Sequence, residues 1–265
     1  MSEALYDRVG DGRVRASALT RGPWDPASQH GGAPAALLAG AIEAVEPGAE
    51  LRVARVTFEL LRPVPVDELR VEAELVRPGR RVQLVAARLL HGDAVVVQAL
   101  ALRVRRAAGV APVVAPGGPA PYPLPSADGA HAAAPPGSSD REPSFATAGV
   151  DIRFASGDYR VPGPAFAWIA LRAPVVAGAD PSPLQRAMAA ADFPNGLSSV
   201  LDWDEHLFIN PDLSVHLERD PVGEWIGLDA ETSIGDDGTG QAIATLYDAR
   251  GRIGRAVQSL YVDRR

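Results

Sequence analysis

The chain of 265 residues contains neither cysteine nor lysine. Without cysteine it can form no disulfide, no thiolate metal site and no cysteine nucleophile. Without lysine, any contact with a phosphate group must come from arginine, from backbone N–H groups or from a helix N-terminus. The five histidines are scattered without the spacing of metal ligands. We therefore expect no metal site and no cofactor.

Long apolar runs and an excess of positive charge are also missing. No segment approaches the roughly 18 consecutive apolar residues of a membrane helix, and the N-terminal residues lack the basic and apolar pattern of a signal peptide. The formal net charge is −7 and the sequence pI is about 5.3. This balance argues against a nucleic-acid or anionic membrane surface. We expect a cytoplasmic protein with no nucleic-acid partner and no membrane partner.

The sequence contains an internal repeat, in which residues 213–265 read as a second copy of residues 55–106. Val56-Thr57-Phe58-Glu59 aligns with Val215-His216-Leu217-Glu218, and an Arg shortly before Pro-Val follows each segment, at Arg62 and Arg219. Gln98 aligns with Gln258, so the offset is about 160 residues, and such a repeat decides the fold before other signals do. The repeat predicts two domains, residues 1–106 and 145–265, joined by a Pro-, Gly-, Ala- and Ser-rich linker at 107–144.

Each copy combines one helical segment with alternating strands. Residues 33–45 are apolar almost all round with Pro near the first turn, and residues 182–191 begin with Ser and then Pro, as helices do. Alternation of apolar and polar residues predicts the strands. They are expected at 4–20 as a hairpin, 52–62, 67–77, 81–91 and 93–105, and again at 150–154, 166–171, 213–219, 224–233, 239–248 and 252–263. The expected class is α+β, with a long central helix wrapped by an antiparallel sheet in each domain.

Several segments, in order along the chain, carry a family resemblance. The stretch 24–38, with Gly31-Gly32 before its helix, resembles the opening helix of acyl-CoA thioesterase-like hotdog proteins. Residues 192–196, 207–216 and 257–260 are similar to the second domain of type II (TesB-like) acyl-CoA thioesterases, in the thioesterase-like superfamily. The resemblance implies a double hotdog fold, and an enzyme that hydrolyses fatty acyl-CoA to free fatty acid and CoA.

The resemblance also implies a catalytic group of an Asp, a Thr or Ser, and a Gln that positions a water. By position these roles fall on Asp192, Asn210 and Gln258, so an amide stands where the family has a hydroxyl. Asp192 would act as base or orient the water, and the two amides would hold it. Each residue also has a plainer interpretation. Asp192 and Asn210 are typical of turns, and Gln258 is typical of a strand residue facing outward, as its twin Gln98 suggests.

The segment His30-Gly31-Gly32 precedes the first predicted helix. Free N–H groups and the helix dipole at that place would suit a thioester carbonyl oxygen, and glycine lets a ligand approach the backbone closely. An ordinary helix start is the alternative. The acyl chain would lie between helix and sheet. The predicted substrate-binding residues are His30, Gly31, Gly32, Phe193, Gly196, Leu197 and Trp225.

Other functions stay open from the sequence. No Gly-x-Ser-x-Gly elbow is present, so a serine thioesterase is not expected. A hotdog dehydratase or hydratase would share the fold, although His30-Gly31-Gly32 does not match its His-x-x-x-Gly form. A non-catalytic acyl-CoA binding protein is compatible with the missing hydroxyl at position 210. The resemblance further implies a homodimer or a higher homo-oligomer.

Overall fold

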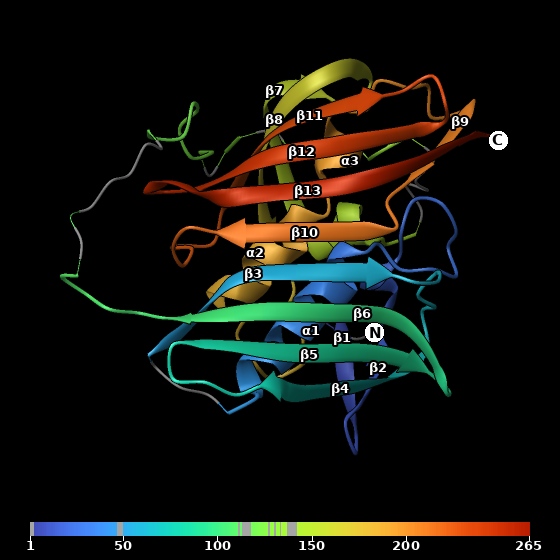
Figure 1. Ribbon diagram of the computed structural model, residues 1–265. Helices are drawn as coiled ribbons and strands as arrows, with labels where there is room; N and C mark the ends of the chain where they lie inside the picture. Colours follow the sequence, from blue (N-terminus) through green and yellow to red (C-terminus); the bar gives the residue numbers. More distant parts are fainter. Residues whose placement is uncertain are drawn as a thin grey trace.

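The computed structural model describes residues 3–46, 50–110, 112, 118–126, 128–129, 131–132, 134–136 and 142–265. Within them the strands form one sheet of 13 strands. In the view of Figure 1 the middle of this sheet lies in front of the helices, and its two ends lie farther back. Its order is β1-β2-β4-β5-β6-β3-β10-β13-β12-β11-β8-β7, with β9 paired to β13. The predicted linker, residues 107–144, lies partly outside the described residues, as do Met1 and Ser2.

The first half of the sheet follows the predicted alternation closely. The strands expected at 52–62, 67–77, 81–91 and 93–105 are confirmed, and so is the N-terminal hairpin. The elements are β1 (Tyr6–Gly10), β2 (Arg13–Ala16), the short 3-10 helix η1 (Ala18–Thr20), β3 (Leu51–Leu60), β4 (Glu68–Arg77), β5 (Val82–His91) and β6 (Ala94–Arg105).

The second half contains all the predicted strands and three further elements. Its strands are β7 (Val150–Asp158), β8 (Val161–Leu171), β9 (His206–Ile209), β10 (Asp212–Leu217), β11 (Ile226–Ile234), β12 (Thr239–Asp248) and β13 (Gly251–Arg264). The sequence patterns do not predict β9, the π-helical turn η2 (Phe145–Gly149) or helix α3 (Pro194–Leu197). Each is only four or five residues long, which is too short for a periodic signal.

The two halves of the sheet meet where β3 pairs with β10, in the middle of Figure 1, and Thr57 pairs there with Ser214. The hairpin β5–β6 matches the hairpin β12–β13 at an offset of 157 residues, because β5 ends at His91 and β12 ends at Asp248. Both hairpins have a β-bulge at the matching place, after Leu89 and after Leu246. The repeat is therefore present in the structure, and the two hairpins show which residues of the two copies correspond.

The register corrects part of the sequence alignment. Arg62 and Arg219 correspond at the same offset of 157 residues that the hairpins set. Val56 corresponds to Leu213, two residues before Val215, so the alignment of Val56 with Val215 was wrong. The sequence alignment was set by similar residue types, whereas the structural register is set by which residues pair: Phe58 pairs with Ala99 and Val215 pairs with Ala256.

Helices α1 (Gly32–Ala44) and α2 (Pro183–Ala191) pack against each other behind the sheet. The expectation of a long central helix in each half is wrong for the second half. There α2 ends after nine residues, because Pro194 has no backbone N–H with which to continue the helical hydrogen bonds. The four-residue α3 follows. The break leaves Asp192 and Phe193 in the turn between the two helices.

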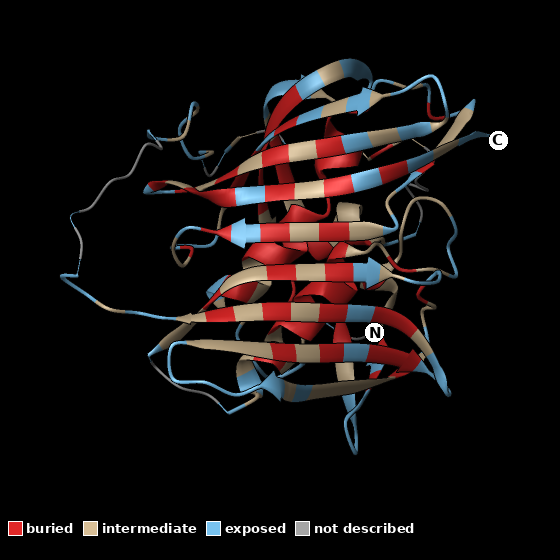
Figure 2. Ribbon diagram, viewed as in Figure 1, coloured by how far each residue is buried: buried red, intermediate tan, exposed pale blue. Residues whose placement is uncertain are grey.

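The core lies between the helices and the inner face of the sheet. Figure 2 shows buried and exposed residues alternating along the strands, as expected for a sheet with one covered face. Phe58 on β3 and Val215 on β10 are both fully buried in one hydrophobic cluster that both halves share. Nine of the residues of α1 are buried, which explains why its sequence is apolar almost all round. None of the described helices is long and apolar enough to span a membrane.

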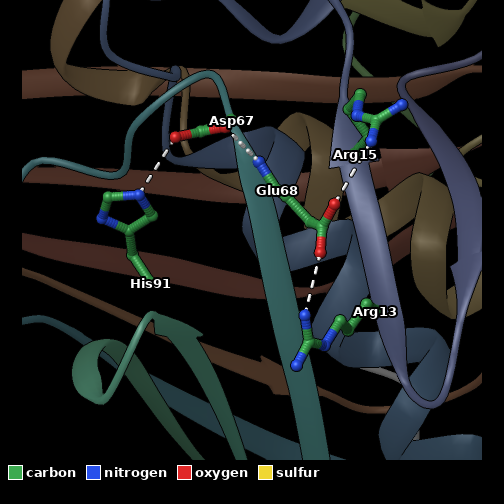
Figure 3. Close-up of polar contacts among 5 residues, drawn as sticks. All are labelled: Arg13, Arg15, Asp67, Glu68 and His91. Atoms are coloured by element: carbon green, nitrogen blue, oxygen red, sulfur yellow. Dashed lines mark hydrogen bonds and ion pairs between the residues drawn. The ribbon is translucent and has the colours of Figure 1, made fainter.

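Exposed ion pairs join β2 to β4 (Figure 3). Arg13 and Arg15 each donate to a carboxylate oxygen of Glu68 at 3.2 Å. Next to them, His91 Nε2 lies 3.1 Å from Asp67 Oδ2. Exposed pairs of this kind contribute little to stability. The distance of 3.1 Å between His91 and Asp67 equals that of a buried His–Asp contact in the site described below.

Candidate active site

A buried carboxylate stands at the C-terminal end of α2. Asp192 is the C-cap residue of the helix, and its side chain is 4% exposed. Its Oδ1 accepts hydrogen bonds from Asn210 Nδ2 at 2.8 Å and from Gln258 Nε2 at 3.0 Å. The structure thus brings together the three residues that the resemblance assigned to a catalytic group.

Gln258 reaches Asp192 because it points inward from β13. Its side chain is fully buried, and its Oε1 accepts a hydrogen bond from the Asn195 backbone N–H at 3.1 Å. Gln98 is exposed, and the residue at the offset of 157 from Gln258 is the buried Ala101. The interpretation of Gln258 as an outward-facing twin of Gln98 was therefore wrong. Side chains alternate in a strand, so a shift of one residue changes the face.

Asn210 is placed by the short strand β9, which pairs with the end of β13 through Ile209 and Tyr261. Its Nδ2 also donates to the backbone oxygen of Asp212 at 3.1 Å. The amide is therefore anchored on both sides and donates to Asp192 at the place where the resemblance implies a hydroxyl. This position depends on β9, which the sequence patterns did not predict.

His30 approaches the other oxygen of the same carboxylate. Its Nδ1 lies 3.1 Å from Asp192 Oδ2 and 3.1 Å from the backbone N of Gly32. The imidazole stacks on Phe193, with ring centroids 4.4 Å apart, and lies 5.1 Å from the ring of Phe145. The His30 side chain is 12% exposed. Stacking on Phe193 and the hydrogen bond that the Gly32 N–H donates to Nδ1 hold this ring next to Asp192.

The loop before α1 is held by a neighbouring polar contact. Gln29 accepts a hydrogen bond from Tyr6 Oη at 2.5 Å and donates to the backbone oxygen of Pro65 at 2.7 Å. Burial raises the pKa of Tyr6 well above its ordinary value, so its hydroxyl remains a donor. These two bonds tie the residue next to His30 to β1 and to the segment after β3.

Gly31 is the N-cap of α1 and touches Asp192. A Cβ atom at Gly31 would lie 2.7 Å from Asp192 Oδ2, which is closer than atoms of this kind pack. Its backbone N–H has no partner among the described residues. Gly32 has even less space for a side chain, because a Cβ there would lie 2.5 Å from the backbone oxygen of Ala189 on α2. The two glycines let the start of α1 approach the end of α2.

These groups face a cavity of about 460 Å³, here called the aromatic cavity. Of the predicted site residues, His30, Gly31, Asp192, Phe193, Gly196 and Asn210 line it. Gly32, Leu197, Gln258 and Trp225 are not among its lining residues. Gln258 contacts the wall from behind, by its hydrogen bond to Asp192. The cavity therefore gathers residues from the loop before α1, the α2–α3 turn and the segment after β9.

Two of the predicted lining residues lie elsewhere. Leu197 is fully buried in the hydrophobic core at the end of α3. Trp225 precedes β11, and the guanidinium of Arg153 lies over its ring at 5.2 Å. Phe193 lines the cavity and also belongs to the same hydrophobic cluster as Leu197.

The cavity has an aromatic wall that the sequence patterns did not point to. Trp24 stacks on Trp203 with centroids 5.2 Å apart, and Phe208 meets both rings edge-on. Tyr159, from the turn between β7 and β8, also lines the cavity, and burial raises its pKa well above the ordinary value. Trp24 lay in the stretch used for the resemblance, but no local signal joins it to Trp203. The wall exists only through packing.

A second cavity, of about 470 Å³, lies at the other end of α1. Five of its eleven lining residues are charged, three of them Arg and two of them acidic. Arg103 donates to the last carbonyls of α1, those of Ile42 and Val45, and Ser182 Oγ donates to Glu43 Oε2 at 2.5 Å. These contacts cap helix ends, so this cavity has a structural explanation. Among the described residues, no group of three or more His, Cys, Asp or Glu side chains is placed to hold a metal ion.

The sequence matches known families over both halves. Residues 20–104 match the family described as the acyl-CoA thioesterase N-terminal domain, and residues 121–262 match the acyl-CoA thioesterase C-terminal domain. Among curated proteins, none matches the sequence.

Solved structures resemble the whole chain. A protein from Thermobifida fusca YX named as a thioesterase II is 20% identical, with 98% of this chain and 95% of that chain covered and a TM-score of 0.75. A protein with a hot dog fold from Alicyclobacillus acidocaldarius is 17% identical, with 97% and 95% covered and a TM-score of 0.70. Acyl-CoA thioesterase II TesB2 from Mycobacterium marinum is 12% identical, with 99% and 96% covered and a TM-score of 0.63.

At such identities the structural neighbours establish the hotdog fold, and the two family matches establish the family. The family matches cover most of the chain, and the larger of them contains Asp192, Asn210 and Gln258. The chain belongs to the acyl-CoA thioesterase family, and it is a thioester hydrolase.

Proposed function

We propose that the protein hydrolyses fatty acyl-CoA to a free fatty acid and CoA, with the attacking water bound beside Asp192. The observation that carries the proposal is the buried Asp192 carboxylate, held by the amides of Asn210 and Gln258 at the wall of the aromatic cavity. Thioester hydrolysis needs a group that activates water and donors for the developing oxyanion. The cluster supplies a fixed negative charge next to the place where the thioester would bind.

The start of α1 supports a site for the thioester carbonyl. The Gly31 N–H lines the cavity and has no protein partner among the residues described. It belongs to a helix of 13 residues, whose N-terminus carries a partial positive charge. A carbonyl oxygen placed there would be stabilised most when it becomes an oxyanion.

The walls of the cavity support an acyl ligand. Trp24, Trp203 and Phe193 offer apolar surface beside the polar cluster, and the cavity of about 460 Å³ lies in the size range of ligand sites. The basic residue in its lining is Arg62, which is exposed. We place the acyl chain against the aromatic wall and the phosphates of CoA toward Arg62, where a guanidinium can bind them.

Release of free CoA, followed with a thiol-reactive dye on acyl-CoA esters of increasing chain length, tests the proposal. The protein has no cysteine, so it adds no background to the signal. Asp192→Asn should lower kcat by about 100-fold or more, because it removes the charge on which proton transfer depends. Asp236→Asn, in the exposed turn after β11, is the matched control and should behave as wild type.

The outcomes are distinct. Turnover that is lost in Asp192→Asn and kept in Asp236→Asn supports hydrolysis at this cluster. Wild-type protein that binds acyl-CoA in calorimetry but releases no CoA would instead make it a carrier. Hydrolysis that is unchanged in Asp192→Asn would place the chemistry elsewhere.

A further inference from the structure

We propose that the outer face of the sheet binds a second copy of the protein, with a two-fold axis that runs across the strands. This face lies on the opposite side of the sheet from α1 and α2, and in Figure 1 none of the described elements lies in front of its middle. Asp192 stands at the end of α2, so the dimer is independent of the proposed thioester hydrolysis. The family resemblance implies an oligomer but does not indicate which surface forms it.

One row of outward-facing side chains, here called the central row, crosses six neighbouring strands from β5 to β12. Each step along it is a direct cross-strand pair, so with strands about 4.8 Å apart the row is about 24 Å long. The chain neighbours of its residues are buried, and alternation therefore points the row itself outward. All of its residues are uncharged and partly exposed. In order they are Ala86, Leu100, Thr57, Ser214, Val257 and Ile243.

Apolar residues are unusual on the open face of an antiparallel sheet, where polar residues normally alternate with buried ones. Leu102 and Leu84, a cross-strand pair beside the central row, extend the apolar surface over β5 and β6. At the far end of the same face the chain covers such a residue itself, because Tyr122 packs on Phe166 with ring centroids 5.0 Å apart and leaves it 1% exposed. The central row stays partly exposed among the described residues, as is typical of a surface that another molecule covers.

Charges of opposite sign flank the central row. On one side, two residues along the strands, Arg55, His216 and Arg255 lie next to one another. On the other side, also two residues along, Glu59 pairs with Asp212, and like charges directly opposite each other destabilise a sheet. None of these arginine and carboxylate side chains has an ion-pair partner among the described residues. Each cluster therefore lacks a counter-charge in its own chain.

The two clusters decide how the second copy fits. Stacked sheets lie about 10 Å apart with their strands nearly aligned. Rotation about an axis along the central row places the row on itself, Arg55 over Glu59 of the second copy, and His216 over Asp212 of the second copy. Rotation about an axis along the strands would instead place basic residues over basic residues and Glu59 over Asp212, which is repulsive. The first axis also forms the Arg55–Glu59 contact twice, as a two-fold interface does.

Sedimentation velocity over a range of protein concentrations tests the surface. The wild type should have twice the monomer mass of 27.8 kDa. Leu100→Glu, which places a charge in the central row, should have the monomer mass. Val161→Glu is the matched control and should stay a dimer, because Val161 begins β8 outside the row and is 57% exposed. Melting curves check folding, and Val257→Arg replaces Leu100→Glu should that variant unfold.

A charge exchange tests the axis. Arg55→Glu and Glu59→Arg should each raise the dissociation constant of the dimer by about 100-fold, because each places like charges against each other across the interface. The double variant Arg55→Glu/Glu59→Arg should return the dissociation constant to within a few-fold of wild type. The two residues are four positions apart on β3, about 13 Å along the strand, so this recovery requires contact between two chains.

The outcomes separate the possibilities. A wild-type protein that remains a monomer at every concentration would overturn the proposal and leave the face to a different partner. A folded Leu100→Glu protein that remains a dimer would place the interface on another surface. A double variant that binds itself more weakly than either single variant would overturn the axis. Failure of the wild type to release CoA would overturn the proposed hydrolysis and leave the dimer standing.

Discussion

Gly31→Ala is the most direct perturbation of the site, because it adds one methyl group against Asp192. That Cβ would lie 2.7 Å from Oδ2, 3.1 Å from Cγ and 3.2 Å from Oδ1 of the carboxylate. Normal contact is near 3.5 Å, so the carboxylate must move by roughly 0.5–1 Å or the α1 N-terminus must retreat. The backbone of Gly31 has φ −59° and ψ −23°, which alanine adopts without strain. Any effect therefore comes from the contact alone.

The expected loss can be worked from that displacement. A movement of about 1 Å in a catalytic group can cost about 100-fold in rate, and overpacking costs about 1–3 kcal/mol of stability. We expect Gly31→Ala to keep its fold and lose most of its kcat. The assay is CoA release beside urea unfolding. Gly196→Ala is the matched control, because Gly196 lines the same cavity but its Cβ would lie 3.7 Å from Trp203, an ordinary contact.

The result that would refute the reasoning is a Gly31→Ala protein with the kcat of Gly196→Ala. Asp192 would then tolerate displacement, and its contacts with His30 and the two amides could not be what sets the rate. A loss of stability larger than about 3 kcal/mol would point instead to disruption of the contact between α1 and α2.

Two further predictions concern CoA binding and the second cavity. Arg62→Ala should raise KM for acyl-CoA with little change in kcat, because Arg62 would bind the phosphates equally in the ground state and in the transition state. Arg80→Ala, in the β4–β5 turn, is the control. Equal KM values in the two variants would show that Arg62 does not bind CoA. Burial raises the pKa of Glu43 above its ordinary 4.5, against the lowering effects of Ser182 and Arg103. As the pH rises, the Glu43 carboxyl therefore loses its proton in the unfolded chain before it does so in the folded protein. The free energy of unfolding consequently falls as the pH rises from about 4.5 through the folded-state pKa of Glu43. Glu43→Gln should be more stable than wild type at pH 7 but not at pH 4 in urea unfolding, with the exposed Glu224→Gln as control; an equal difference at both pH values would contradict this.

Local patterns predicted most of the fold. Strands β3 to β6 and β10 to β13 lie within one to three residues of the predicted ends, because one face of each strand is buried and alternation reports that burial. The Ser-Pro start of α2 predicted its Ser182 cap, and the structure extends it to a capping box with Gln185. The segment expected as the second helix, residues 182–191, matches α2, but the expectation of a long central helix in each half, which the family resemblance implied, is wrong there.

The site was predicted in its residue types more than in its arrangement. The resemblance placed Asp192, Asn210 and Gln258 in one group, and in the structure Asn210 and Gln258 each donate a hydrogen bond to Asp192. Trp225 and Leu197 were misplaced as cavity residues, since a helix or strand pattern says which face is apolar but not which space that face borders. Trp203 and Tyr159 were missed because each lies in a turn or loop with no periodic signal.

The sequence by itself determined the family, the repeated strands and the absence of thiol chemistry, because composition and short-range backbone preferences decide these. Only the tertiary structure decided that Gln258 faces inward while Gln98 faces solvent, and that His30 meets a carboxylate 162 positions further along the chain, at 3.1 Å. The register of a strand depends on bulges and on its partner, and contact between distant residues depends on how α1 and α2 pack. No local stretch of residues determines the register of a strand or the contacts between distant residues.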